Sequence, residues 1–322
     1  GVVLAVPGGA VQADVAVVAV GVRPRVELAR DAGIRLGAAG AIAVDERLAT
    51  SAPHVWAVGD CAEVHHAVLG EPAYFPLGSL ANREGRTLAN ILAGRPDRFP
   101  PVVGAVAAKV FDFSVAATGC TLARARERGL EACAVWLTIE DRAHYWPEAK
   151  VIRIKLVYEA DSRRVLGVQS VGAGDAVKRV DVATQRIAAG ATLDDLAHVE
   201  HAYAPPYAPA MEPLAVAAQV AQNQEDGVVA VAPDASVDGM RILDVRLEEE
   251  SATRPAFTDR AIHVGLGDLA SRLDEVDRST DLVVCERGTR SAEAVRRLRQ
   301  QGFKARYLGG GLRWRSLAEE GK

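Results

Sequence analysis

The stretch Leu282-Val-Val-Cys-Glu-Arg-Gly-Thr-Arg-Ser291 joins a short apolar run to a segment with helical spacing. Residues 282–285 carry no charged side chain, as is typical of a strand buried on both faces of a sheet. A loop containing Gly288 follows, and Ser291 stands where a helix N-cap is expected, at the start of a helix over 291–301. This strand–loop–helix unit predicts a parallel α/β sheet with a cysteine at the end of one strand.

Two further apolar segments, residues 241–245 and 305–308, are predicted strands of the same sheet. The region before them has a different pattern. Residues 104–118 and 132–140 are expected to be extended, and residues 151–157 alternate apolar and polar side chains, as in a strand with one wet face.

A hairpin turn at 159–163 leads to a returning strand over 165–171, and an amphipathic helix is predicted over 178–189. Strands followed by a helix indicate an α+β unit. Residues 203–207 contain adjacent prolines, which remove backbone donors, so we expect irregular structure there.

In the N-terminal hundred residues, residues 14–20 form a nearly continuous apolar run, and we expect them to be a buried strand. Shorter strands are predicted over 40–45 and 54–58, and a helix over 80–92.

Composition excludes several classes of protein. The 322 residues carry a formal net charge of −4, 49% are hydrophobic and 25% are charged, so we expect no nucleic-acid partner. We find no run long enough for a membrane helix. The 4 cysteines show no CxxC spacing, which argues against a disulfide scaffold or zinc ribbon and favours a reducing, cytoplasmic location.

Cys285 is the sharpest candidate for a reactive group. Backbone N–H groups of such a loop, with the positive end of the helix dipole, stabilise a thiolate or the terminal sulfur of a persulfide. Arg287 and Arg290 are expected to add positive charge for an anionic sulfur donor. A buried structural cysteine is the alternative, because most free cysteines are inert core residues.

The same stretch resembles the loop of the rhodanese (sulfurtransferase) domain, C-x-x-G-x-R-S. Leu243-Asp-Val-Arg246 and Gly309-Gly-Gly-Leu-Arg-Trp314 match two further signatures, so the resemblance covers about residues 235–318. It implies that Cys285 carries sulfur with Arg290 beside it, and that Asp244 and Arg246 support the loop. The persulfide loop would comprise Glu286, Arg287, Gly288, Thr289 and Ser291.

One departure concerns the family's G-H-I-P-G-A segment. Only its tail is matched, by Arg260-Ala-Ile-His-Val264. We therefore expect weaker support of the loop and a low or specialised sulfurtransferase activity.

The second motif is Thr50-Ser-Ala-Pro-His-Val-Trp-Ala-Val-Gly-Asp60. A carboxylate at the carboxyl end of a strand accepts hydrogen bonds from sugar-like hydroxyls, and Gly59 lets a ligand approach. An Asp60 that caps the next turn is the alternative. The motif resembles the second flavin-contacting segment of the pyridine nucleotide–disulfide oxidoreductases, which implies that Asp60 binds the FAD ribitol. Residues 77–82 resemble the helix start that faces the flavin ring, which implies further FAD contacts at Gly59, Gly78, Ser79 and Ala81.

The middle region extends this resemblance to the dimerisation domain of the coenzyme A-disulfide reductase and NADH oxidase branch. The matching segments are His144-Tyr-Trp-Pro, Leu166 to Gly172, Lys178-Arg-Val-Asp181 and Tyr203-Ala-Pro-Pro-Tyr207. The resemblance implies a homodimer in which Tyr145 and Tyr203 reach the substrate of the partner subunit. Packing in the core or interface is the alternative. Met211 replaces an expected lysine, which weakens the case for tight binding of coenzyme A phosphate.

Other polar residues have simpler interpretations. We interpret Cys61, Cys120 and Cys133 as buried structural thiols. The histidine pairs 65–66 and 198/201 lack a set of partners for a metal, and we expect no metal site. Glu248-Glu-Glu250 is expected to be a solvated face.

The predicted fold class combines α/β and α+β domains, with four segments. Residues 1–24 would end an NAD-binding domain, 25–100 would belong to an FAD-binding domain, 101–222 would form a dimerisation domain and 223–322 a small parallel-sheet rhodanese-like domain. Linkers are expected at 100–101 and 222–239.

The resemblance implies the carboxyl-terminal portion of an FAD-dependent, NAD(P)H-linked reductase, because no G-x-G-x-x-G unit or redox cysteine of that family is found here. Its substrate would be a small sulfur species such as coenzyme A disulfide, a persulfide or a polysulfide. A dimerisation and docking module without catalysis, or a sulfurtransferase without flavin, are the alternative hypotheses.

Overall fold

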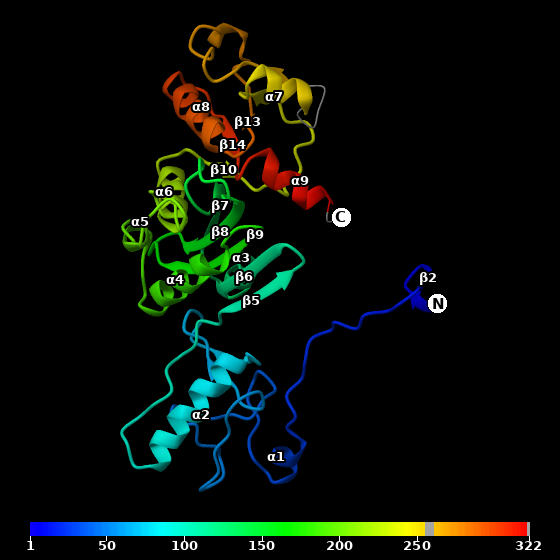
Figure 1. Ribbon diagram of the computed structural model, residues 1–322, viewed down its shortest axis with the longest axis vertical. Coiled ribbons are helices and arrows are strands. Elements are labelled where there is room, and N and C mark those ends of the chain that lie inside the picture. Colours follow the sequence, from blue (N-terminus) through cyan, green and yellow to red (C-terminus); the bar gives the residue numbers. More distant parts are fainter. Residues whose placement is uncertain (255–260, 321–322) are drawn as a thin grey trace. The chain divides into compact units, whose positions relative to one another are not determined.

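The computed structural model describes residues 1–254 and 261–320, which fall into two compact units (Figure 1). The first unit comprises Gly1–His65 and Pro72–Pro101. The second comprises His66–Glu71 and Val102–Lys322. Since the boundary falls at Pro101, adjacent prolines do separate compact units at this point, although the short segment His66–Glu71 folds with the second one.

The first unit contains little regular structure. Its elements are the antiparallel pair β1 (Val2–Val6) and β2 (Gly9–Ala13), α1 (Glu27–Asp31), the pair β3 (Val64–His65) and β4 (Pro72–Ala73), and α2 (Gly78–Leu92). A small apolar cluster that includes Val26, Ile42 and Ala57 forms its core. The helix predicted over 80–92 is confirmed as α2, and Gly94 follows it with a φ of 78°.

Three strand predictions in this unit were wrong. Residues 15–20 form no strand, and Val17, Val18 and Val20 are 83% to 89% exposed. No strand of the described chain pairs with this run, and an apolar run is buried only where a sheet covers it. Residues 40–45 and 54–58 form isolated bridges instead of strands, and His54 interrupts the second with a φ of 62°.

The second unit begins with a five-stranded antiparallel sheet in the order β5-β6-β9-β8-β7. The strands are β5 (Val106–Val110), β6 (Phe113–Gly119), β7 (Ala132–Glu140), β8 (Val151–Glu159) and β9 (Val165–Gly172). The predicted extended segments and the hairpin are thus confirmed. Alternate residues of β8, among them Ile152, Ile154 and Leu156, are fully buried, as the alternating pattern predicts.

Four helices accompany this sheet. They are α3 (Leu122–Glu127), α4 (Val177–Ala188), α5 (Leu193–Ala197) and α6 (Pro213–Glu225). Helix α4 packs on β6 and β9, and α6 packs on β7 and β8 (Figure 1). Their apolar faces close a core that contains Val180, Ala183 and Leu214.

A second five-stranded sheet follows, with all neighbouring strands parallel and in the order β10-β14-β13-β11-β12. Its strands are β10 (Ala230–Val231), β11 (Ile242–Asp244), β12 (Ala261–His263), β13 (Leu282–Val284) and β14 (Arg306–Leu308). Its helices are α7 (Glu248–Thr253), the 3-10 helix η1 (Leu273–Glu275), α8 (Thr289–Gln300) and α9 (Leu312–Glu320). The prediction of a parallel α/β sheet is confirmed.

The linker predicted over 222–239 was wrong in part. Helix α6 continues to Glu225, and β10 already pairs with β14 at Ala230. The Gln224 side-chain oxygen accepts a hydrogen bond from the Ala230 amide at 3.2 Å, so the intervening turn is short and tied down. The polar residues at the start of 222–239 therefore belong to the end of helix α6 and do not form a linker.

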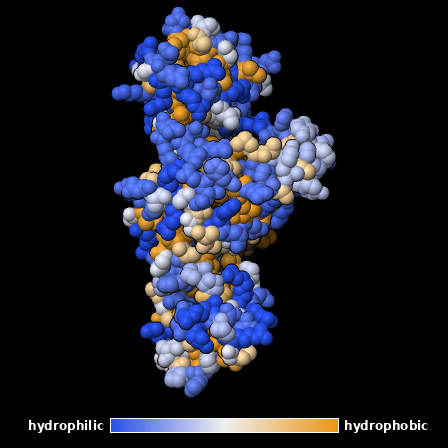
Figure 2. Space-filling model, turned by 90° about the vertical axis from the view of Figure 1, so that its left-hand side faces the viewer, coloured by the Kyte–Doolittle hydropathy of each residue, from blue (hydrophilic) through white to orange (hydrophobic). Residues whose placement is uncertain are grey.

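No helix among the described residues is both long and apolar enough to cross a membrane. Figure 2 shows hydrophobic residues that reach the surface between hydrophilic ones. Several of the largest fully buried side chains lie in the two sheets of the second unit, among them Ile154, Leu156 and Leu243.

Candidate active site

Cys285 follows β13, whose residues Leu282, Val283 and Val284 are all fully buried. The strand is central in the parallel sheet, with β14 on one side and β11 on the other. Its carboxyl end therefore delivers the thiol to the edge of the sheet where loops and helix N-termini gather, which is where open α/β sheets bind ligands.

Main-chain amides converge on the sulfur. The N–H groups of Gly288 and Ser291 donate to Cys285 Sγ, with N···S distances of 3.1 and 3.3 Å, and Ser291 Oγ lies 3.3 Å away. This arrangement stabilises negative charge on the sulfur. Cys285 is also 0% exposed, so the sulfur is shielded from water and receives its hydrogen bonds from the protein.

The loop depends on the left-handed conformation of Gly288, whose φ is 97°. A side chain there would be strained and would approach the amide of Gly310 to 3.3 Å. The prediction that Ser291 is the helix N-cap was wrong: α8 begins at Thr289, and Gly288 precedes it. Ser291 lies in the first turn, where its hydroxyl donates to the Gly288 carbonyl at 3.0 Å.

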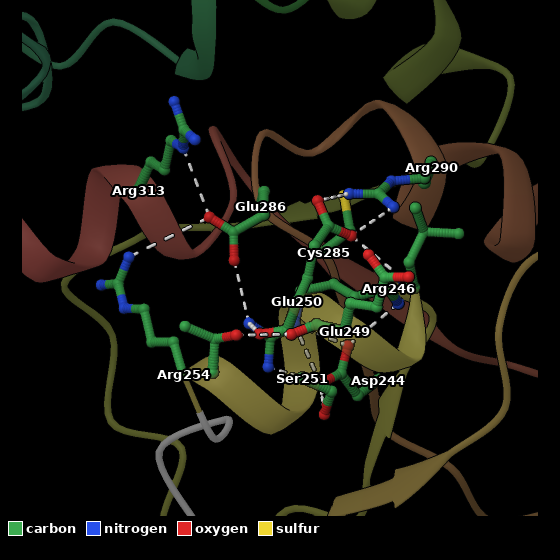
Figure 3. A network of polar contacts seen from close by, with 12 residues as sticks. Asp244, Arg246, Glu249, Glu250, Ser251, Arg254, Cys285, Glu286, Arg290 and Arg313 are labelled. Carbon is green, nitrogen blue, oxygen red and sulfur yellow. Dashed lines mark hydrogen bonds and ion pairs between the residues drawn. The ribbon is translucent and has the colours of Figure 1, made fainter.

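A buried ion pair supports the loop (Figure 3). The Arg246 side chain is fully buried, and its Nη2 and Nε donate to the carboxylate of Asp244 at 2.7 and 3.0 Å. Arg246 Nη1 reaches Glu286 Oε1 at 2.9 Å. The end of β11 is thereby tied to Glu286, the residue that follows Cys285.

Arg290 and Arg287, the two cations expected to add positive charge for a sulfur donor, are each paired with a carboxylate. Arg290 forms a two-pronged ion pair with Glu250, at 2.6 and 2.8 Å, and Arg287 pairs with Glu140 at 2.5 Å. Each cation is therefore largely compensated by a carboxylate. The pair with Arg290 lowers the pKa of Glu250.

The prediction that Glu248-Glu-Glu250 is a solvated face was wrong for its last residue. Glu250 also accepts a hydrogen bond from the Leu247 amide at 3.0 Å and so closes the first turn of α7. The sequence signal for this role was available, because an acidic residue in the third position of a helix often binds back to the residue before it.

A cleft of about 630 Å³ adjoins this network. Its lining includes Glu250, Glu286, Arg254 and Arg313, and the thiol is not part of it. Figure 3 shows Arg254 and Arg313 on either side of Glu286. Residues 260–264 were matched to the tail of the G-H-I-P-G-A segment. Ala261–His263 of this stretch form β12, whereas Arg260 lies outside the described residues.

The second candidate site lies in the first unit, around Gly59 and Asp60. Gly59 has a φ of 76°, and its amide donates to the buried carboxylate of Glu84. Burial raises the pKa of Glu84, and this hydrogen bond opposes the shift. Asp60 is exposed, and its carbonyl accepts a hydrogen bond from the Tyr74 hydroxyl at 3.0 Å.

Helix α2 begins beside this turn. Gly78 and Ser79 are exposed at its first turn, and no side chain caps it. The Ala81 N–H donates to the Leu77 carbonyl at 3.0 Å. A Cβ atom at position 59 would lie 3.4 Å from the Cβ of Ala81, so the Ala81 side chain lies close to the Gly59 turn.

A cavity of about 450 Å³ lies next to Asp60, and Arg23, Arg25, Cys61 and Tyr74 line it. An exposed carboxylate, a left-handed glycine and an uncapped helix start together suit a ligand with hydroxyl groups and hydrogen-bond acceptors.

The two predicted tyrosines lie together in the second unit. They form a side-chain hydrogen bond with each other, which raises the pKa of Tyr145. Tyr145 is 64% exposed and Tyr203 is 52% exposed. The ring of Tyr145 also lies edge-on to that of His144, with centroids 5.4 Å apart, and the ring of Tyr203 lies edge-on to that of His201 at 6.4 Å.

The remaining cysteines and histidines have local roles. Cys120 is buried, whereas Cys61 and Cys133 are half-buried, so the prediction of burial was wrong for those two. His198 and His201 contact backbone carbonyls through ring nitrogens. Among residues 1–254 and 261–320, no group of three or more histidine, cysteine or acidic side chains is placed to hold a metal ion.

Comparison with known families assigns the class of two segments. A profile described as "Pyridine nucleotide-disulphide oxidoreductase" matches residues 3–83, and the dimerisation-domain profile of that family matches residues 106–215. The chain therefore carries pyridine nucleotide-disulphide oxidoreductase domains within a mixed α/β fold. The dimerisation domain coincides with the antiparallel sheet and its helices.

Individual relatives extend the match. The chain is 37% identical over 213 residues to an NAD(P)H sulfur oxidoreductase (CoA-dependent) from Pyrococcus furiosus, covering 66% of this chain and 48% of that protein. It thus spans about half the length of such relatives. The structure of a NAD-dependent persulfide reductase from A. fulgidus superimposes with a TM-score of 0.89 and 42% identity, over 95% of this chain and 56% of the other. The reduced Bacillus anthracis CoADR-RHD gives a TM-score of 0.87 and 35% identity, with the same coverage.

Proposed function

We propose that this chain is part of an FAD-dependent, NAD(P)H-linked reductase of sulfur species, and that its C-terminal domain is a rhodanese-type sulfurtransferase. The observation that carries the sulfurtransferase part is the convergence of the Gly288 and Ser291 amides on Cys285 Sγ at 3.1 and 3.3 Å. The reductase part is supported by the matched domains and by relatives described as sulfur oxidoreductase and persulfide reductase.

The proposed boundaries are those expected from the sequence. Residues 1–24 and 25–100 would belong to the NAD- and FAD-binding domains, residues 101–222 to the dimerisation domain, and residues 223–322 to the sulfurtransferase. The parallel sheet of strands β10 to β14, with Cys285 at the carboxyl end of its central strand β13, supports the last assignment.

Sulfur transfer would be a nucleophilic substitution at sulfur. The Cys285 thiolate attacks the outer sulfur of a donor such as thiosulfate, a new S–S bond forms, and the donor's S–S bond breaks to release sulfite. A nucleophilic acceptor then removes the outer sulfur and restores the thiolate. The amides of Gly288 and Ser291 stabilise the negative charge on the sulfur before attack.

The residues around Asp60 fit the sugar-alcohol and ring portions of FAD, because an exposed carboxylate lies beside a glycine turn and an uncapped helix start. Asp60 would accept hydrogen bonds from ribitol hydroxyls, and the amides of Gly78 and Ser79 would donate to the flavin ring. Bound FAD would supply electron transfer from NAD(P)H to a disulfide or persulfide.

We propose a homodimer built through the dimerisation domain, in which Tyr145 and Tyr203 face the substrate site of the partner subunit. Their exposure and their shared hydrogen bond support this role. The substrate would be a small-molecule sulfur species, with coenzyme A thiol or persulfide as the leading class, since one relative is described as CoA-dependent.

Transfer of sulfur from thiosulfate to cyanide tests the sulfurtransferase part. We expect Cys285→Ser to abolish formation of thiocyanate and Cys133→Ser, a matched change at a half-buried thiol, to leave it intact. Transfer that survives Cys285→Ser contradicts the assignment. For the reductase part, Asp60→Ala in the complete natural protein is expected to lower its flavin content, measured by absorbance, and its NAD(P)H consumption with coenzyme A persulfide.

A docking module without catalysis is favoured by one observation, the complete burial of Cys285. Alkylation by a thiol reagent across pH separates the two functions. A thiol that reacts only near pH ~8.5, as an ordinary cysteine does, supports docking, whereas reaction at lower pH supports catalysis.

A further inference from the structure

Strand β7 is an edge strand of the antiparallel sheet, and it contacts both the Cys285 loop and the 309–311 turn that packs on this loop. Thr138, on β7, donates from its hydroxyl to the carbonyl of Gly310 at 2.7 Å in a buried hydrogen bond. Glu140, the last residue of β7, forms the 2.5 Å ion pair with Arg287. Both contacts join the dimerisation domain to the parallel sheet.

The turn that Thr138 holds is itself packed on the loop. The amide of Leu312 donates to the Cys285 carbonyl at 2.9 Å, and the amide of Arg313 donates to the Glu286 carbonyl at 3.0 Å. A side chain on Gly311 would collide with the backbone of Glu286 at 2.5 Å, so the two segments are in close contact. The loop is therefore fixed on one side by the 309–311 turn.

Arg287 fixes the other side. The peptide group between Arg287 and Gly288 is planar, so an anchored Arg287 restricts the direction of the Gly288 N–H. That N–H is the closest donor to Cys285 Sγ, at 3.1 Å. The Glu140 and Arg287 side chains are 19% and 34% exposed, so their ion pair is partly shielded from water.

We propose that Glu140 is a positioning residue for the sulfur site: through Arg287 it orients the amide that stabilises the Cys285 thiolate. The dimerisation domain thus completes a site whose reacting atom belongs to the other domain. This inference rests on the proposed sulfurtransferase function.

Glu140→Ala and Arg287→Ala test the pair in the full chain. We expect each to lower the second-order rate constant for transfer from thiosulfate to cyanide by about fivefold, the upper range for a partly exposed ion pair. The double variant should also lose about fivefold and not about 25-fold, since the second change removes no further interaction. Alkylation of Cys285 should require higher pH in each variant, which a loss of global stability alone does not produce.

Glu293→Ala is the matched control, because it removes an ion pair with Arg296 and Arg297 on the outer face of α8 without touching the loop. The charge-reversed pair Glu140→Arg with Arg287→Glu should recover much of the lost rate, and it keeps the test informative should a single variant fold poorly. This inference alone is overturned if Glu140→Ala and Arg287→Ala keep wild-type rates and alkylation profiles while Cys285→Ser abolishes transfer. Transfer that survives Cys285→Ser overturns the proposed function instead.

Discussion

Replacement of Arg246 by methionine should be among the most destabilising single changes in the parallel sheet. The Arg246 side chain is fully buried and holds Asp244, whose side chain is only 2% exposed. Methionine fills a similar volume but donates no hydrogen bonds. The carboxylate of Asp244 would therefore remain buried with its principal cation gone, and Glu286 would lose its contact at 2.9 Å.

The expected cost follows from that geometry. Removal of one member of a buried ion pair costs about 3–5 kcal/mol, because the remaining charge stays desolvated. An exposed pair contributes only up to about 1 kcal/mol. Since a domain is stable by about 5–15 kcal/mol, the loss would be a large fraction of the total.

Hydrogen exchange measured by mass spectrometry reports this change locally, on peptides that contain β11 and β13. We expect amides of Leu243 and Val283 to exchange at rates about 100-fold or more faster in Arg246→Met, as a loss of 3 kcal/mol or more implies. Arg272→Met removes an exposed pair with Glu275 and serves as the control. Exchange in Arg246→Met that matches this control refutes the argument that the buried pair supports the sheet.

Three further changes have expected outcomes. Glu84→Gln keeps an acceptor for the Gly59 amide and removes a carboxyl whose pKa in the folded protein is raised above 4.5. Wild-type stability should therefore fall as the pH rises from 4.5 through that folded pKa, and the melting temperature of the variant should not show this fall. Tyr203→Phe should return the pKa of Tyr145 toward 10.0, as measured by phenolate absorbance. Glu250→Gln weakens the ion pair of Arg290 and should lower the KM for thiosulfate about threefold; an unchanged KM means that Arg290 does not contact the donor.

Local pattern was sufficient for the sulfur loop and for both sheets of the second unit. The run Leu282-Val-Val, the glycine at 288 and the helical spacing that follows all act within a few residues of one another. The same holds for the hairpin of β8 and β9, where the alternation of side chains and the turn are both local signals.

Ion pairs between residues far apart in the chain could not be predicted from local sequence patterns. Arg290 binds Glu250 forty residues earlier, and Arg287 binds Glu140 at the end of strand β7, so no local pattern indicates that either charge is compensated. The exposed run at 15–20 shows the same limit, since apolar character predicts burial only when a covering partner is present.

The mass of the peptide that contains Cys285, measured after incubation with thiosulfate and without a reductant, shows whether this cysteine accepts a sulfur atom. We expect a gain equal to one sulfur atom on that peptide and no such gain on the peptides of Cys61, Cys120 and Cys133. An unmodified Cys285 peptide at saturating thiosulfate contradicts it.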